Sequence, residues 1–209
     1  MGLSMAYNYW EKGTELMDPQ VHHLFADDLT SGRTVAELPI LYYTVAQLWR
    51  ITGPNAFVYR LFMLLLHFAG SYALFLTFRR FLADSGWAVL ASLFFFTSPA
   101  IVYFAIGFMP DVPAYDLVLL GFYALVRRWP EERKDDMVFS AVLFALAALL
   151  KIAALMVPHA FWCWGRSRSL YRNVFAKAGG FFRNRRLLIG LLLGVLVLVF
   201  TWYAWSDVQ

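Results

Sequence analysis

Two ionisable side chains lie inside stretches that are otherwise apolar, and they are the residues best placed to do chemistry. Asp111 stands between Pro110 and Pro113, and Lys151 stands within a second apolar run. A charge at membrane depth is unfavourable unless water or a partner group stabilises it, so such a residue is a functional candidate by default. A lysine that faces an open cavity would also suit a phosphate, because its ammonium is a compact point charge.

Both residues also have purely structural interpretations. Asp111 at the start of a helix over 112–126 would accept hydrogen bonds from free backbone amides, and Pro113 suits a first turn. Lys151 would extend toward water or pair with Asp116. Asp116 lies five residues after Asp111, which is about 140° around a helix of 3.6 residues per turn. The two carboxylates therefore do not share a face, and we interpret Asp116 as structural.

Two more charged residues stand at the starts of predicted helices. Glu37 precedes Pro39, which suits a helix start, and its carboxylate would stabilise the positive end of that helix. Arg60 opens the first full apolar span, where it is either a boundary residue or a contact for an anion. Both residues remain candidates beside Asp111 and Lys151.

No residue set in the sequence has the spacing of a strong metal or cofactor motif. The His22-His23 and Asp27-Asp28 pairs resemble a loose metal-ligand cluster without a recognised spacing. We interpret His67 and His159, on apolar segments, as hydrogen-bonded core residues. The single Cys163 allows neither an intrachain disulfide nor a cysteine metal cluster. We therefore predict no metal and no cofactor.

The composition indicates which elements must hold these residues. Of 209 residues, 61% are hydrophobic and only 15% are charged, against about 25% charged in a soluble domain. Several apolar runs approach the roughly 20 residues that a membrane helix needs. These values exclude a disordered chain, a disulfide scaffold and an ordinary cytosolic enzyme. They predict an all-α, polytopic membrane helical bundle.

The chain divides into a polar head and a membrane domain. Residues 1–55 form the predicted extracytoplasmic loop, with an interfacial helix over 38–49 that is rich in tyrosine and tryptophan. Residues 56–205 form the predicted membrane domain, with a tight turn at Asp111. Its six inserted helices are predicted at 56–78, 87–107, 112–126, 137–150, 152–164 and 187–205.

The distribution of basic residues determines how the segment 137–164 is interpreted. A helical hairpin broken near Lys151 keeps that charge from the bilayer midplane, where it costs about 2.5 kcal/mol or more. It also gathers 13 of the 18 basic residues on one face, as the positive-inside rule expects. The net charge of +4 then reports orientation rather than nucleic-acid binding. The 13 residues are Arg79, Arg80, Arg127, Arg128, Arg133, Lys134, Arg166, Arg168, Arg172, Lys177, Arg183, Arg185 and Arg186. The head, Asp111, Lys151 and the C-terminus fall on the opposite, extracytoplasmic face.

The order of several short motifs resembles that of GT-C-type membrane glycosyltransferases. It is most similar to the branch with protein O-mannosyltransferases and the lipid A aminoarabinose transferase. The motifs are Asn8 to Gly13, Asp18-Pro19, Glu37-Leu38-Pro39, Gly53, Arg60, Ser98-Pro99, Met109-Pro110-Asp111 and Leu150-Lys151. The resemblance implies transfer of a sugar from a polyprenyl-phosphate donor to an acceptor glycan, lipid or protein. The reaction would occur at the extracytoplasmic face of a multi-pass cell-membrane protein, with no nucleic acid involved.

The resemblance also assigns roles to single residues. Asp111 and Glu37 match acidic residues of the family's outer loops and would be catalytic. Lys151 and Arg60 match residues that meet the donor phosphate. The implied mechanism is an inverting displacement in which a carboxylate orients or deprotonates the acceptor and cationic groups stabilise the leaving phosphate. The apolar helices would hold the lipid tail.

One departure from the family pattern keeps other functions open. Family members begin with a membrane helix and an outer-loop Asp that precede the position of Met1, and they continue beyond the position of Gln209 with further helices or a soluble domain. We therefore expect a chain truncated at both ends. Asp27, Asp28 or Glu15 would be substitutes for that base. The alternatives are a non-catalytic membrane subunit that binds a lipid phosphate or assists assembly, and, less favoured, a small transporter.

Overall fold

The structure is a computed structural model, and it describes residues 2–22, 32, 37–82, 84–127, 134–156 and 185–206. Every element in these ranges is helical, as the composition predicted. The α-helices are α1 (Gly2–Lys12), α2 (Ile40–Thr52), α3 (Ala56–Phe81), α4 (Ser85–Phe96), α5 (Pro99–Ala105), α6 (Asp111–Val126), α7 (Lys134–Leu150) and α9 (Arg185–Ser206). A short 3-10 helix, η2 (Ile152–Leu155), follows α7.

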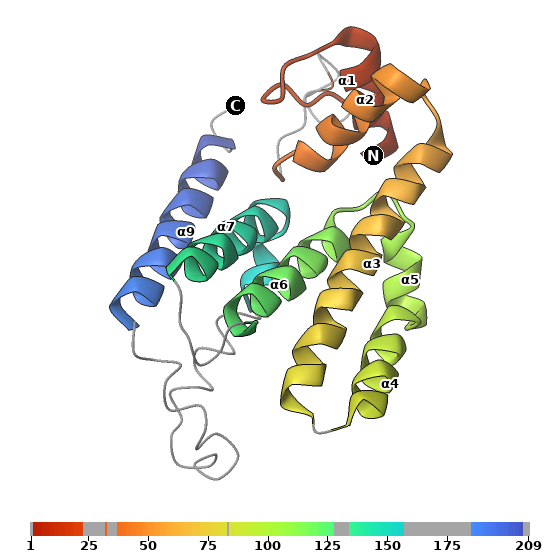
Figure 1. Cartoon of the computed structure of the whole chain (residues 1–209). Coiled ribbons are helices and arrows are strands. Elements are labelled where there is room, and N and C mark those ends of the chain that lie inside the picture. The colour runs from red at the N-terminus through yellow and green to blue at the C-terminus, as the bar shows by residue number, and fades with distance from the viewer. Residues whose placement is uncertain are drawn as a thin grey trace.

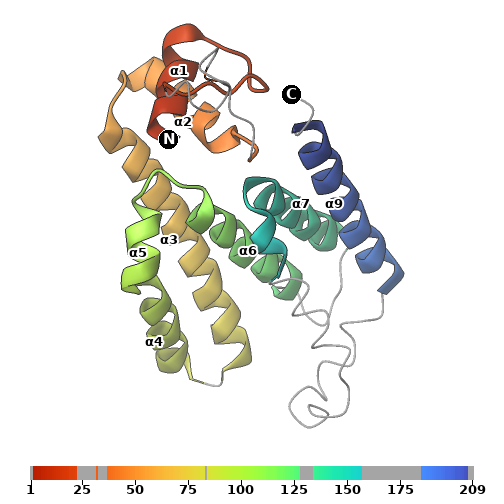
Figure 2. The same ribbon diagram turned by 180° about the vertical axis from the view of Figure 1, so that it is seen from behind.

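The long helices lie side by side in a row, and α1 and α2 form a helical cap at one end of this row (Figure 1). Helix α6 packs against α3 on one side and α7 on the other, and α9 packs against α7. Helix α4 packs beside α3. Helices α1 and α2 pack on each other at the end where α3 begins. Figure 2 shows that α9 ends toward this capped side of the molecule.

Side-chain caps explain where two of the helices begin. Asn55 Oδ1 accepts a hydrogen bond of 2.8 Å from the Phe57 amide at the start of α3. Asp84 Oδ1 accepts one of 2.7 Å from the Gly86 amide at the start of α4. Such caps satisfy backbone donors that have no partner within the helix. Helix α3 extends beyond the predicted 56–78 because its last turn includes Arg79 and Arg80, whose charges suit the negative helix end.

The predicted helix over 87–107 is two helices in the structure. Helices α4 and α5 meet at an angle of 58°. Pro99 begins α5 and has no backbone N–H to donate to a preceding turn. The Phe95 carbonyl oxygen, which would have accepted from residue 99, instead accepts from the Ser98 amide at 3.2 Å. The break at Pro99 is additional to the predicted one at the two prolines around Asp111.

Helix α7 ends at Leu150, next to the lysine where the sequence suggested a break. Lys151 has extended backbone angles, with φ −156° and ψ 112°, and η2 follows it. The predicted helix over 152–164 is described only as far as Met156, and its remainder lies outside the described residues. The predicted last span, 187–205, corresponds to α9.

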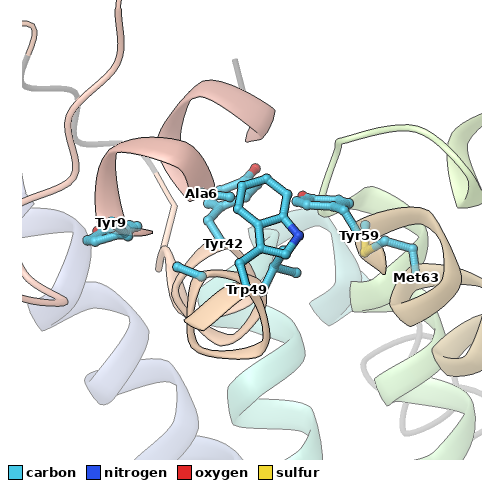
Figure 3. Close-up of a cluster of buried hydrophobic side chains, with 8 residues drawn as sticks. Ala6, Tyr9, Tyr42, Trp49, Tyr59 and Met63 are labelled. Carbon is cyan, nitrogen blue, oxygen red and sulfur yellow. The ribbon is translucent and has the colours of Figure 1, made fainter. Parts of the chain in front are cut away.

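A buried cluster joins the cap to the first long helix (Figure 3). Trp49 of α2 lies between α1 and α3, and its indole Nε1 donates to the Asn55 carbonyl oxygen at 2.9 Å. Its neighbours in the cluster are Ala6, Tyr9, Tyr42, Val45, Ala46, Tyr59 and Met63. Leu38 and Leu41 belong to two further clusters, formed with α6, α7 and α9. The cap is therefore fixed to both halves of the helical row.

Apolar side chains cover the outside of the molecule while some polar ones are buried. Trp87 and Phe94 on α4 are 65% and 81% exposed, whereas His67 and Asp116 are fully buried. Large exposed apolar areas mark membrane or protein contacts. Among the described residues, α3 is the one helix with the length and apolarity to cross a bilayer. The bent pair α4 and α5 meets the same criteria only when taken together.

Candidate functional site

Three charged side chains from distant parts of the chain meet below the cap. Lys151 Nζ donates to Glu37 Oε1 at 2.6 Å. The same Nζ lies 3.4 Å from Asp111 Oδ1. All three side chains are partly exposed, at 36% for Lys151, 23% for Glu37 and 36% for Asp111. The structure thus brings together three of the four site residues that the sequence singled out.

Asp111 is the first residue of α6, directly after Pro110. The positive end of the helix stabilises a carboxylate at this position. Pro113 in the same turn needs no hydrogen-bond partner for its nitrogen. The capping hydrogen bonds considered from the sequence are absent among the described residues: Pro110 is the N-cap of α6, and the Asp111 carboxylate reaches Lys151 instead.

Lys151 occupies the break between α7 and η2. Its backbone amide still donates to the Ala147 carbonyl oxygen at 2.9 Å, which completes the last turn of α7. Leu150 and Leu155 on either side are buried, so the surrounding backbone is held by packing. The extended conformation at Lys151 turns its side chain out of the row of buried leucines and toward the two carboxylates.

Glu37 is placed by the residue that follows it. The Leu38 amide donates to the Leu149 carbonyl oxygen at 2.9 Å, and the Leu38 side chain is buried among residues of α7 and η2. Pro39 is then the N-cap of α2. These contacts hold the Glu37 backbone beside the end of α7, and the carboxylate is free to reach Lys151.

Arg60 is not in direct contact with the three charges. Its guanidinium lies 5.4 Å from the centre of the Phe108 ring, which is a cation–π distance. Phe108 also packs edge-on against Tyr59 at 4.9 Å and lies three residues before Asp111. Arg60 is exposed and forms no ion pair within the part of the chain that the structure describes. It therefore offers a free cation near the loop that leads into α6.

Tyr42 is a residue near the site that sequence reasoning missed. As a tyrosine of the predicted interfacial helix, it is expected at the membrane boundary. In the structure it is buried, and burial raises the pKa of its phenol, as do the nearby carboxylates of Glu37 and Asp111. The phenol therefore stays protonated near the two carboxylates. The sequence feature that could have linked Tyr42 to the site is its position five residues after Glu37.

Asp116 has a partner other than Lys151. Its Oδ1 lies 3.1 Å from His67 Nδ1 of α3, and both side chains are buried. The suggested pairing of Lys151 with Asp116 is therefore wrong, since Asp116 faces α3 whereas Asp111 faces the end of α7. The different faces follow from the helical angle between the two positions.

The described residues contain no group of three or more His, Cys, Asp or Glu side chains arranged to hold a metal ion. His22 is described and hydrogen-bonds to Ser4, whereas His23, Asp27, Asp28, His159 and Cys163 lie outside the described residues. The chemistry available at the site is therefore that of one ammonium, two carboxylates and a neighbouring phenol.

The comparisons with known proteins give one match. The family model described as dolichyl-phosphate-mannose-protein mannosyltransferase matches residues 36–205. This range contains Glu37, Arg60, Asp111 and Lys151. No curated protein and no solved structure matches the chain.

Proposed function

This chain belongs to the dolichyl-phosphate-mannose-protein mannosyltransferase family, and we propose that it transfers a sugar from a polyprenyl-phosphate donor to an acceptor at the extracytoplasmic face. The family makes it a membrane glycosyltransferase of the mannosyltransferase type. The observation that carries the proposal is the contact of Lys151 with both Glu37 and Asp111. A cation for the phosphate and carboxylates for the acceptor are the two kinds of group that this reaction needs.

The reaction is a displacement at the anomeric carbon of the sugar. The acceptor hydroxyl loses its proton to Asp111 or Glu37, and its oxygen forms the new bond to that carbon. The bond from the carbon to the phosphate oxygen breaks, and its electron pair leaves with the polyprenyl phosphate. Lys151 and Arg60 stabilise the negative charge that develops on the leaving phosphate.

The proposed membrane arrangement follows from the ends of the helices. Asp111 begins α6, and Arg127 follows its last residue. Arg80, in the last turn of α3, donates to the Arg127 carbonyl oxygen at 2.8 Å, so basic residues gather at that end. The positive-inside rule assigns this end to the cytoplasm and the capped end to the exterior. We propose this orientation for the inserted helices of the 56–205 membrane domain, with α4 and α5 as one broken segment in place of the predicted helix over 87–107.

A transfer assay tests the proposal directly. The full chain is placed in lipid nanodiscs with radiolabelled dolichyl-phosphate mannose and an acceptor peptide rich in serine and threonine. Asp111→Asn and Lys151→Gln should each lower the transfer rate by roughly 100-fold, within the range for loss of an acid–base or charge-stabilising group. Glu11→Gln, which removes an exposed carboxylate on α1, is the matched control and should keep full activity.

Three outcomes distinguish the possibilities. Full activity in Asp111→Asn and Lys151→Gln would contradict the assignment of the site. Failure of the wild-type chain to bind dolichyl phosphate would contradict the donor class. Binding of dolichyl phosphate without transfer to any acceptor would instead favour a lipid-phosphate-binding subunit.

A further inference from the structure

Glu37 holds the position on Lys151 that a phosphate would need. The 2.6 Å contact between Lys151 Nζ and Glu37 Oε1 has the length of a strong charge-assisted hydrogen bond. With Asp111 at 3.4 Å, the ammonium has two carboxylate neighbours, and the three groups together carry one net negative charge. An entering phosphate is therefore repelled until one carboxylate leaves Lys151.

The two carboxylates differ in what would hold them without Lys151. Asp111 lies in the first turn of α6, where the positive helix end stabilises it independently of the lysine. Its short side chain also extends directly from a helix. Glu37 precedes α2, and the described contact of its carboxylate is the one with Lys151. Its longer side chain can turn away while the hydrogen bond between Leu38 and Leu149 keeps its backbone in place.

We propose that the donor phosphate replaces Glu37 on Lys151, so that donor binding releases the Glu37 carboxylate for the acceptor. This inference rests on the proposed function, because it requires a phosphate ligand at Lys151. No covalent bond changes in the exchange: one anion takes the place of another beside the ammonium. Once Glu37 Oε1 no longer accepts from Lys151, it is free to accept the proton of the acceptor hydroxyl, so the acceptor is activated by Glu37 after the donor has bound. Binding is then ordered, with the donor first.

Equilibrium binding of dolichyl phosphate, which has no sugar to transfer, tests the exchange. The 209-residue chain is placed in nanodiscs of phosphatidylcholine, which has no net charge, and the dissociation constant is measured for wild type and variants. Glu37→Gln should bind about three- to tenfold more tightly, because a partly exposed ion pair and a local negative charge are removed. Lys151→Gln should bind at least about tenfold more weakly, as expected when a charge-assisted contact is lost. Glu11→Gln makes the same charge change away from Lys151 and should bind like wild type.

A second variant and a kinetic measurement guard against a folding defect in Glu37→Gln. Glu37→Asp keeps the charge but shortens the reach to Lys151, and it should also bind more tightly than wild type, by a smaller factor. In the transfer assay, Glu37→Gln should lower both KM for the donor and kcat. A merely structural role for Glu37 would not lower KM.

The results separate the exchange from the proposed function. If wild type binds dolichyl phosphate, Lys151→Gln does not, and Glu37→Gln binds equally or more weakly, the exchange is wrong and the donor site stands. If Lys151→Gln binds as tightly as wild type, the phosphate does not meet Lys151. Both the exchange and that part of the proposed function then fail.

Discussion

His67 of α3 and Asp116 of α6 face each other in the interior, with Nδ1 of the histidine 3.1 Å from Oδ1 of the aspartate. The His67 ring also stacks on Phe96 of α4, with centroids 5.0 Å apart and planes 7° from parallel. Three helices therefore meet at one polar contact, and Asp116 is just over one turn from Asp111. The pair fixes the helix that carries Asp111.

Loss of this pair should destabilise the protein. Asp116→Ala leaves the buried His67 without its partner, and we expect the free energy of unfolding to fall by on the order of 1–3 kcal/mol. Unfolding in detergent, followed by circular dichroism during titration with sodium dodecyl sulfate, measures the change. Asp116→Asn retains a hydrogen-bonding amide and should lose less. An Asp116→Ala protein as stable as wild type would show that the contact contributes little.

Gly70 allows α3 and α6 to approach at the same level. A Cβ atom at this position would lie 2.8 Å from the Asp116 Cα, which is backbone and cannot turn aside. Gly70→Ala should therefore separate the helices and destabilise the protein by about 1–3 kcal/mol. Gly194→Ala on α9 is the matched control, since nothing lies within 4 Å of the added atom. Equal stability of the two variants in the same titration would contradict the close packing.

The sequence predicted the local elements better than the contacts between them. Apolar length and proline positions indicated helices close to α3, α6 and α9, and charges in apolar surroundings identified Asp111 and Lys151. Lys151 Nζ lies 3.4 Å from Asp111 Oδ1, as the prediction that both residues fall on one face requires. The pairing of His67 with Asp116 was not predictable, because it joins residues 49 positions apart through helix packing. Helix periodicity alone does not determine such a contact.

At the site itself, the contacts of Arg60 and Tyr42 were likewise not predictable from the sequence. Both lie in segments whose helical character was expected, yet the arginine stacks on Phe108 while the tyrosine lies near the carboxylates. The side-chain direction depends on how α2 and the start of α3 pack under α1. That packing joins three segments separated by loops, and no short sequence motif predicts it.

Tyr42 should resist ionisation in alkaline solution. Burial and the carboxylates of Glu37 and Asp111 raise the pKa of its phenol above the unfolded value of 10.0, and burial does the same for Tyr9. Because the folded state favours the neutral phenol, this contribution to stability is complete below about pH 10 and declines as the pH rises further.

Absorbance at 295 nm, titrated from pH 9 upward, tests this behaviour. In the folded protein fewer than the 11 tyrosines should ionise near pH 10, and the remainder should ionise on unfolding. Tyr42→Phe should leave the first phase unchanged and reduce the second by one tyrosine. A reduction in the first phase instead would mean that Tyr42 titrates normally.

Labelling of introduced cysteines tests the orientation in the membrane. With the native Cys163 replaced by serine, Thr52→Cys lies at the capped end and Ser85→Cys lies at the turn between α3 and α4, and both positions are exposed. In intact cells an impermeant maleimide should label Thr52→Cys, and Ser85→Cys only after permeabilisation. The reverse pattern would place the three-charge site on the cytoplasmic side and contradict an extracytoplasmic reaction.

Arg60 should contribute to donor binding without determining whether transfer occurs. Its exposed guanidinium over Phe108 is free to contact a phosphate oxygen, while the carboxylates that activate the acceptor are held by other segments. Arg60→Gln should therefore raise KM for dolichyl-phosphate mannose by about tenfold, equivalent to about 1.4 kcal/mol, with a smaller change in kcat. Arg60→Lys keeps the charge and should recover part of the loss.

Arg50→Gln, which removes a cation from the last turn of α2, is the matched control and should leave KM unchanged. If Arg60→Gln and Arg50→Gln had the same KM as wild type, the phosphate would be held by Lys151 without Arg60.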